Sequence, residues 1–458
     1  MVRTLLIIAV AALTGICAFA IYAWHPAIAA IEPPAASSFD PALVRRGETL
    51  AAVGNCVTCH SAPDRPSFSG GVPVETPFGT IYASNITPDP ETGIGRWSEA
   101  AFARSMRQGL DREGRHLYPA FPYDHFTHVS DGDDRALYAY LMTREPARSR
   151  VPGNQLVFPL GFRPLLAGWK LLFLHPGPLG DAPEHDSTWR RGAYLVEGLG
   201  HCGACHSPRN ALGAEKGGDA HLAGGVVEGW NAYALNAASP APTPWTVDAL
   251  AFYLRHGFEQ VHGVSRGPMA PVTANLATTS DADARAMATY LVSLMDRGVR
   301  NPATRPKDVE PPSPAEGVYA SAGSQVVATA SDPDGAATYA GACASCHESG
   351  RPVPWGGLPL HLSSALHAPD PSNIVIVTLH GLAAPPGESG AIMPGFDGTL
   401  RDDEIVRLLA YLRRDIAGEA PWPDLARTVA DVRSRAVTLY PSDGTSAAPA
   451  ETQVRVQP

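Results

Sequence analysis

Six of the seven cysteines fall in three copies of one pattern, Cys-x-x-Cys-His. Composition alone would supply only about 0.004 copies by chance. Two thiols one helical turn apart can add across the two vinyl groups of a haem, and the adjacent imidazole then faces the iron as its proximal ligand. The pattern therefore predicts three covalently bound haem c groups, attached through three sets of residues: Cys56, Cys59 and His60; Cys202, Cys205 and His206; Cys343, Cys346 and His347.

Two other chemistries use similar patterns, a zinc site and a redox-active dithiol. A structural zinc site needs four ligands close together, whereas these motifs are widely separated in the chain. A thioredoxin-like dithiol would need a strand–helix context, and the surrounding sequence does not provide one. Both alternatives are disfavoured.

The second axial ligand of such a haem is commonly a methionine on a loop. Gly257 and Gly381 each follow a helical segment that ends in Arg-His or Leu-His, and a methionine comes at the same distance after each glycine. These are Met269 and Met393, and each has a proline neighbour in loop-like sequence. A methionine in a hydrophobic core would instead lie in a periodic run. We therefore expect Met269 and Met393 to ligate the second and third haems.

The first motif lacks this methionine, because the matching position after Gly109 is Phe121. Met106 comes too early and suits packing on the preceding helix. Three histidines are nearer, and our hypothesis is that His125 ligates haem 1; His128, Met106 or an open site are alternatives. Methionine raises the reduction potential relative to histidine, so haem 1 should have the lowest potential of the three. The nearby histidines are His116, His125 and His128.

Helical elements that could position these ligands repeat along the chain. Residues 130–141 match residues 280–291 and 402–412, each with an acidic first turn and an apolar face at helical spacing. Asp40-Pro41 and Ser187 begin helices that lead into the first two motifs. A helix before each motif and a helix after it predict a mainly α fold of three tandem cytochrome c domains.

The N-terminal region contains an uncharged apolar run from Leu5 to Trp24, long enough to span a bilayer as a helix. Arg3 precedes the run and the first acidic residue after it is Glu32, which places the N-terminus in the cytoplasm and the rest across the membrane. A membrane anchor is expected, with a cleaved signal peptide as the alternative, because Ala27-Ile28-Ala29 has the shape of a cleavage site. Cys17 lies in this run and needs no partner.

Composition bounds both the number of domains and the function. The chain has 458 residues, too many for one hydrophobic core, and its net charge of -10 without a Lys/Arg run argues against a nucleic-acid binder.

An apolar stretch from Leu156 to His175 has two interpretations, a connector packed between domains or a surface at the membrane or a quinone site. The expected segments are an anchor or signal (1–30), domain 1 (38–150), an apolar connector (151–185), domain 2 (186–298), a linker (299–335), domain 3 (336–417) and a tail (418–458).

Several further stretches resemble the triple-haem cytochrome c subunits of membrane-bound periplasmic dehydrogenases. They are Thr76 to Gly79, Asn85 to Asp89, Tyr118 to Tyr123, Arg191 to Leu195 and Cys202 to Asn210. Members of this family serve alcohol and gluconate dehydrogenases, or molybdenum hydroxylases that oxidise isoquinoline, nicotinate or aldehydes. Phe121, followed by Tyr-Asp-His, is more similar to the molybdenum-hydroxylase branch.

This resemblance implies a subunit that transfers electrons and is not itself an enzyme. The electrons would come from a dehydrogenase catalytic subunit, either molybdenum/iron–sulfur or quinoprotein, and go to ubiquinone or a terminal oxidase. The expected location is the periplasmic side of a bacterial inner membrane. Two alternatives remain open, a subunit of a quinoprotein alcohol dehydrogenase and a peroxidase-type enzyme with an open site at haem 1.

Overall fold

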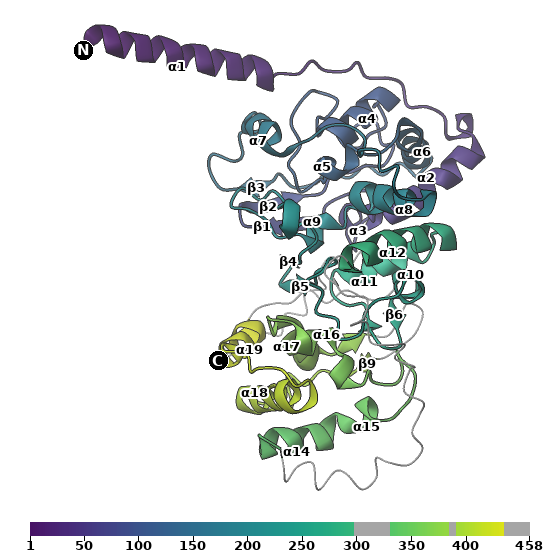
Figure 1. The fold of residues 1–458 in the computed structure, drawn as a ribbon. Helices are drawn as coiled ribbons and strands as arrows, with labels where there is room; N and C mark the ends of the chain where they lie inside the picture. The colour runs from purple at the N-terminus through teal and green to yellow at the C-terminus, as the bar shows by residue number, and fades with distance from the viewer. Residues whose placement is uncertain (297–329, 384–390, 435–458) are drawn as a thin grey trace. The chain divides into compact units, whose positions relative to one another are not determined.

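The computed structural model describes residues 1–296, 330–383 and 391–434, which form two compact units (Figure 1). Unit 1 comprises Met1–Pro183, Tyr194–His201 and Asn210–Ala214. Unit 2 comprises Glu184–Ala193, Cys202–Arg209 and the described residues from Glu215 onward. The first haem motif therefore lies in unit 1, and the second and third motifs lie in unit 2.

Unit 1 is mainly helical, with one small sheet. Its helices are α1 (Val2–Ala23), η1 (Ala36–Ser38), α2 (Pro41–Val53), α3 (Cys56–His60), α4 (Glu99–Gln108), α5 (Tyr123–Phe126), α6 (Asp131–Met142), α7 (Leu165–Phe173) and η2 (Tyr194–Leu199). Its antiparallel sheet has the order β1 (Pro73–Thr76), β2 (Gly79–Tyr82) and β3 (Gln155–Leu156). The register pairs Val74 with Ile81 and Thr80 with Gln155.

Unit 2 has helices and three short antiparallel hairpins. In its first part the helices are α8 (Ser187–Ala193), α9 (Gly203–His206), η3 (Gly218–Ala220), α10 (Val247–His256), α11 (Met269–Leu276) and α12 (Asp281–Asp296). In its second part they are α14 (Pro333–Ala342), α15 (Ala344–His347), η5 (Leu360–Leu362), α16 (Ser364–His367), α17 (Ser372–His380), α18 (Asp402–Tyr411), η6 (Leu412–Ile416) and α19 (Leu425–Ser434). The hairpins pair β4 (Gly225–Val227) with β5 (Trp230–Ala232), β6 (Phe258–Glu259) with β7 (Gly263–Val264), and β8 (Leu382–Ala383) with β9 (Ala391–Met393).

A helix before each haem motif packs against the helix that closes the same repeat: α2 with α6, α8 with α12, and α14 with α18 (Figure 1). A glycine lies at each crossing, and a Cβ atom there would meet backbone of the partner helix. At Gly47 the added Cβ would lie 1.9 Å from the Ala136 carbonyl oxygen. At Gly192 it would lie 1.9 Å from the Ala286 carbonyl oxygen, and at Gly335 it would lie 2.4 Å from the Arg407 carbonyl oxygen. Glycine therefore permits each backbone contact.

An ion pair accompanies each crossing. Arg46 binds Asp133 at 2.6 Å and Arg191 binds Asp283 at 2.7 Å. In the third repeat the charges are exchanged, because Asp334 on the first helix binds Arg407 on the last. Each pair joins the helix that leads into a haem motif to the closing helix.

Side chains cap the starts of several of these helices, and Asp40 does so as the sequence predicts. Asp40 accepts a hydrogen bond from the Ala42 backbone N–H, with Pro41 in the first turn. Ser130 and Ser280 accept from the N–H groups of Asp133 and Asp283. Each bond satisfies one of the backbone donors that a helix start leaves without a partner.

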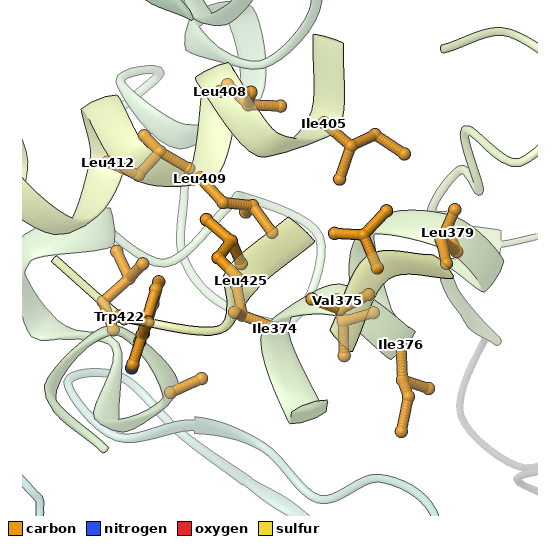
Figure 2. Packing of buried hydrophobic residues seen from close by; sticks show 14 of the residues in the cluster. Ile374, Val375, Ile376, Leu379, Ile405, Leu408, Leu409, Leu412, Trp422 and Leu425 are labelled. Carbon is orange, nitrogen blue, oxygen red and sulfur yellow. The ribbon is translucent and has the colours of Figure 1, made fainter. Parts of the chain in front are cut away.

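The hydrophobic core of the last repeat extends beyond the predicted end of domain 3 at residue 417. Figure 2 shows Trp422 and Leu425 packed with Leu409 and Ile374 in this core. Val429 and Val432, further along α19, are fully buried. The segment predicted as a tail (418–458) therefore begins with a helix that packs into this core.

Other predicted boundaries also differ from the structure. Tyr194–His201, assigned to domain 2, packs in unit 1, where Leu195, Val196 and Leu199 are fully buried. The apolar connector (151–185) folds with unit 1 up to Pro183. Most of the linker (299–335) and the last part of the tail (418–458) lie outside the described residues, and α14 begins at Pro333, within the predicted linker.

Helix α1 is long and apolar enough to cross a membrane, with a mean hydropathy of 2.6. The segment that follows is attached to unit 1. Ile28 N–H donates to the Arg112 carbonyl at 2.9 Å, Ile31 N–H donates to that of Arg96 at 3.1 Å, and Arg104 donates to the Pro26 carbonyl. The chain is therefore tied to unit 1 immediately after α1.

The glycine crossing predicts the effect of one added methyl group. Gly335→Ala should weaken the α14–α18 contact by roughly 1–3 kcal/mol, because the Cβ would overlap Arg407 backbone. Hydrogen exchange of amides in α14 and α18, measured by mass spectrometry, reports this local opening. Gly341→Ala in the same helix has no atom within 4 Å and should be neutral or slightly stabilising. Equal exchange rates in the two variants would contradict the conclusion that the close contact at Gly335 is what limits the side chain at this position.

Candidate haem sites

Each haem motif lies on a very short helix that places its two cysteines one turn apart. Motif 1 forms α3, motif 2 begins just before α9, and motif 3 begins just before α15. None of the six cysteines, all of them in the described part of the chain, is in a disulfide. Two thiols at this spacing match the two vinyl groups of one haem.

The histidine of each motif is oriented by a backbone carbonyl from a later loop. The distance from Nδ1 to the carbonyl oxygen is 2.7 Å for His60 and Ser84, 2.6 Å for His206 and Tyr233, and 2.7 Å for His347 and Leu358. An Nδ1–H donor on the ring leaves Nε2 as the atom that can bind a metal. All three imidazoles therefore have the hydrogen bonding of a haem-ligating histidine.

Burial lowers the pKa of all three motif histidines below the usual histidine range. The neutral imidazole is the form that binds iron, so the environment favours the ligating state. The thiol spacing, the ring hydrogen bonds and the neutral imidazoles together fit haem c. When bound, the haem supplies reversible one-electron chemistry at its iron.

The loop after each of the first two motifs has the same backbone hydrogen bonds. Gly70 N–H donates to the His60 carbonyl at 2.8 Å, and Gly224 N–H donates to the His206 carbonyl at 2.7 Å. The hydroxyls of Ser61 and Ser207, next to the histidines, accept from the backbone N–H groups of Phe68 and Leu222 at 2.9 Å. These bonds hold the loop against the motif in both repeats.

In the third repeat a glycine contacts the motif histidine directly. A Cβ atom at Gly357 would lie 2.8 Å from His347 Nδ1, and the Gly357 N–H donates to the Cys346 carbonyl at 3.2 Å. The backbone at Gly357 lies close to the His347 ring, and the carbonyl of Leu358, the next residue, accepts a hydrogen bond from that ring. Glycine is needed because any side chain would push the ring away from this acceptor.

The three glycines used to locate the distal ligands all end a helix with positive φ, 59° at Gly109, 75° at Gly257 and 74° at Gly381. In register, the Leu117 N–H donates to the Gly109 carbonyl and the Ser265 N–H donates to that of Gly257, both at 2.7 Å. The two loops therefore share one conformation up to this point.

In this register, Phe121 of the first repeat corresponds to Met269 of the second. Both residues come four positions after the matched N–H, and Met269 is the first residue of α11. Met393 ends β9, beside the helix-ending glycine of the third repeat, since β8 pairs Leu382 with Met393. Met269 and Met393 are both half-buried.

The side chains considered for haem 1 differ in burial and in their hydrogen-bond partners. Met106 is buried on α4, and His116 is committed to the N-terminal segment, because its Nε2 lies 2.9 Å from the Ala23 carbonyl. Burial lowers the pKa of His116 to about 4. His125 is buried on α5, and its Nδ1 lies 2.7 Å from the Glu197 carbonyl, the same arrangement that orients the motif histidines. His128 is half-buried and its Nδ1 contacts the Gly177 carbonyl at 2.7 Å.

Sequence reasoning missed the carbonyl partners Ser84, Tyr233 and Leu358. A backbone carbonyl has no residue-type signature, and these partners lie far from their histidines in the chain. The correspondence between the first two partners is visible only in the structure, where Ile86 N–H donates to the Phe68 carbonyl and Leu235 N–H donates to the Leu222 carbonyl.

Comparison with known proteins finds a matching family model and several similar proteins. Residues 330–412 match the family model described as cytochrome C oxidase, cbb3-type, subunit III. The chain is 46% identical to a nicotinate dehydrogenase subunit of Pseudomonas putida over 90% of its own length, and spans about a third (33%) of that longer protein.

Two further relatives match over most of both chains. The gluconate 2-dehydrogenase cytochrome c subunit of Pantoea cypripedii is 35% identical, with 86% of this chain and 90% of the relative covered. The cytochrome c subunit of the quinone-dependent alcohol dehydrogenase of Gluconacetobacter polyoxogenes is also 35% identical, with 86% and 85% covered.

The contact between Gly357 and His347 predicts a change in potential. Gly357→Ala should weaken the bond from the His347 ring to the Leu358 carbonyl, which makes the imidazole a poorer electron donor and raises the potential of one haem. If the bond stabilises the ferric state by about 1 kcal/mol more than the ferrous state, its loss corresponds to roughly 40 mV for one electron. Spectroelectrochemical titration measures this shift. Gly398→Ala is the matched control, because a Cβ atom at Gly398 would have no atom within 4 Å. Equal haem potentials in the two variants would rule out a role for Gly357 in positioning the His347 ring.

Proposed function

Because the chain belongs to the family of cytochrome c subunits of dehydrogenase complexes, we propose that it is a three-haem relay from a substrate-oxidising subunit to a quinone or terminal oxidase. The observation that carries the proposal is the repeated site: three thiol pairs, each next to an imidazole whose Nδ1 faces a backbone carbonyl. This arrangement suits reversible one-electron transfer, because a firmly held ligand changes little between the two oxidation states.

Each set of residues has a distinct role in this proposal. The six motif cysteines hold the haems through thioether bonds, and His60, His206 and His347 bind the irons. Met269 and Met393 are the second ligands of haems 2 and 3. Each comes twelve residues after a glycine that ends a helix with positive φ, and this shared register supports the role.

For haem 1 we propose His125 as the second axial ligand. Its short helix α5 lies just after the position that Met269 holds in the second repeat. The Glu197 carbonyl at its Nδ1 fixes the ring as the Ser84 carbonyl fixes His60. Two histidine ligands would give haem 1 the lowest potential, so that electrons would enter there and leave through the methionine-ligated haems.

The partner that delivers electrons is proposed to be a molybdenum hydroxylase. The 46% identity to a nicotinate dehydrogenase subunit exceeds that to the gluconate and alcohol dehydrogenase subunits. Phe121 in place of methionine also resembles the molybdenum-hydroxylase branch of the family. The catalytic site for the substrate would lie on the partner, and this chain would accept its electrons.

Helix α1 is proposed to be a retained membrane anchor, with both units on the periplasmic side of a bacterial inner membrane. Its length and apolar composition suit a bilayer span. Cleavage after Ala29 would remove the backbone contacts of Pro26 and Ile28 with unit 1, so those contacts support retention over a cleaved signal.

Replacing the proposed haem 1 ligand should change the spin state of one iron. In His125→Ala, one of three low-spin ferric signals in the low-temperature electron paramagnetic resonance spectrum should become high-spin, and added imidazole should restore it. His128→Ala is the matched control on the same loop and should leave all three signals unchanged. If only His128→Ala loses a signal, or if neither variant does, His125 is not the ligand.

Carbon monoxide distinguishes the relay from a peroxidase-type enzyme with an open haem 1. A relay with three six-coordinate haems should bind little carbon monoxide when reduced, because every iron already has two protein ligands. The optical spectrum of the dithionite-reduced protein, titrated with carbon monoxide, measures the bound fraction. Rapid binding of one equivalent would reject the relay and favour the enzyme.

A further inference from the structure

The segment 157–172 presents an exposed apolar surface on unit 1. Phe158 is 97% exposed, Leu171 is 68% exposed and Leu172 is 61% exposed. We call this the connector surface, and define it by its exposed apolar residues: Val157, Phe158, Phe162, Leu165, Leu171 and Leu172. So many large apolar side chains in one short segment are unusual on a surface that faces water.

The two charged residues of this segment turn inward. Arg163 donates to the His116 carbonyl at 2.9 Å. Lys170 is only 7% exposed, and its Nζ donates to the carbonyls of Gln108 and Gly109 at 2.6 and 2.7 Å, where it caps the end of α4. Helices that face water normally place Lys and Arg outward. This segment has the opposite arrangement, and its outward face carries no charge.

The connector surface adjoins the end of α1. A Cβ atom at Gly168 of α7 would lie 3.7 Å from the Phe19 ring of α1. Trp24, directly after α1, is 71% exposed, and Tyr22 is also exposed. Tryptophan and tyrosine at the end of a membrane helix mark the level of the lipid headgroups. The connector surface therefore lies beside the point where α1 leaves the bilayer.

We propose that the connector surface inserts into the headgroup region of the bilayer that α1 spans. The proposal rests on α1 being a membrane anchor, as proposed above. A lipid surface suits an uncharged apolar face that is continuous with a membrane helix, because such a face offers few polar groups for specific pairing with a protein. Together, α1 and the connector surface attach unit 1 at two adjacent places and limit its tilt at the membrane.

Lipid photolabelling tests this contact in the full-length holoprotein. The protein is placed in nanodiscs of phosphatidylcholine and phosphatidylglycerol that contain a lipid with a diazirine on its acyl chain, and labelled peptides are identified by mass spectrometry. Label is expected on α1 and on residues 157–172. Two exposed apolar residues of unit 2, Val226 and Trp355, should remain unlabelled.

A charge variant separates insertion from mere proximity to α1. Leu171→Glu/Leu172→Glu should lower labelling of residues 157–172 by roughly tenfold, because a charged group resists transfer into lipid, while labelling of α1 stays the same. Val226→Glu is the control in unit 2 and should change neither. Unchanged circular dichroism and haem spectra show that the double variant is folded.

Three outcomes overturn the proposal. Label on α1 with no more label on residues 157–172 than near Trp355 rejects the connector surface and leaves the anchor standing. No label on either segment rejects both the contact of the connector surface with lipid and the membrane anchor. Loss of label from residues 157–172 alone, when a soluble ubiquinone analogue is added, assigns the surface to quinone binding instead of lipid.

Discussion

The hydrogen bond from a motif imidazole to a distant backbone carbonyl is the constraint on which the sites depend. His60 and His206 find their acceptors at Ser84 and Tyr233, so the loop after each motif must return to the ring. The bonds from Gly70 and Gly224 back to the motif, and the close crossing at Gly47 and its equivalents, keep that loop and the motif helix in place. The ring orientation is thus a property of the whole repeat.

The first and second repeats differ at the position where a methionine ligand is expected. Backbone bonds to Gly109 and Gly257 keep the two loops in register, yet Phe121 replaces the methionine side chain that could bind iron. The Glu197 carbonyl, which faces His125, comes from the segment that leads into the second motif. That segment packs with unit 1, so the surroundings of His125 are built partly from residues far along the chain.

Much of the chemistry could be predicted from the sequence, because cysteine and histidine at fixed spacing carry their own signal. The start of α2 was also predictable, since Asp40 before Pro41 is a cap signal and its side chain caps the helix. Features that depend on backbone atoms or tertiary packing could not be predicted, such as the Leu358 carbonyl at His347. The helix after residue 417 was missed because its three buried residues are separated by charged ones, and only the core of the last repeat shows why they are apolar.

In the relay that we propose, haem 1 has a different second ligand from haems 2 and 3 and the lowest potential of the three. A potentiometric titration of the purified protein, followed together by optical and electron paramagnetic resonance spectra, measures this order. We expect three one-electron steps, with the lowest belonging to the haem that lacks a methionine ligand. Fewer than three steps, or a lowest step that belongs to a methionine-ligated haem, would contradict it.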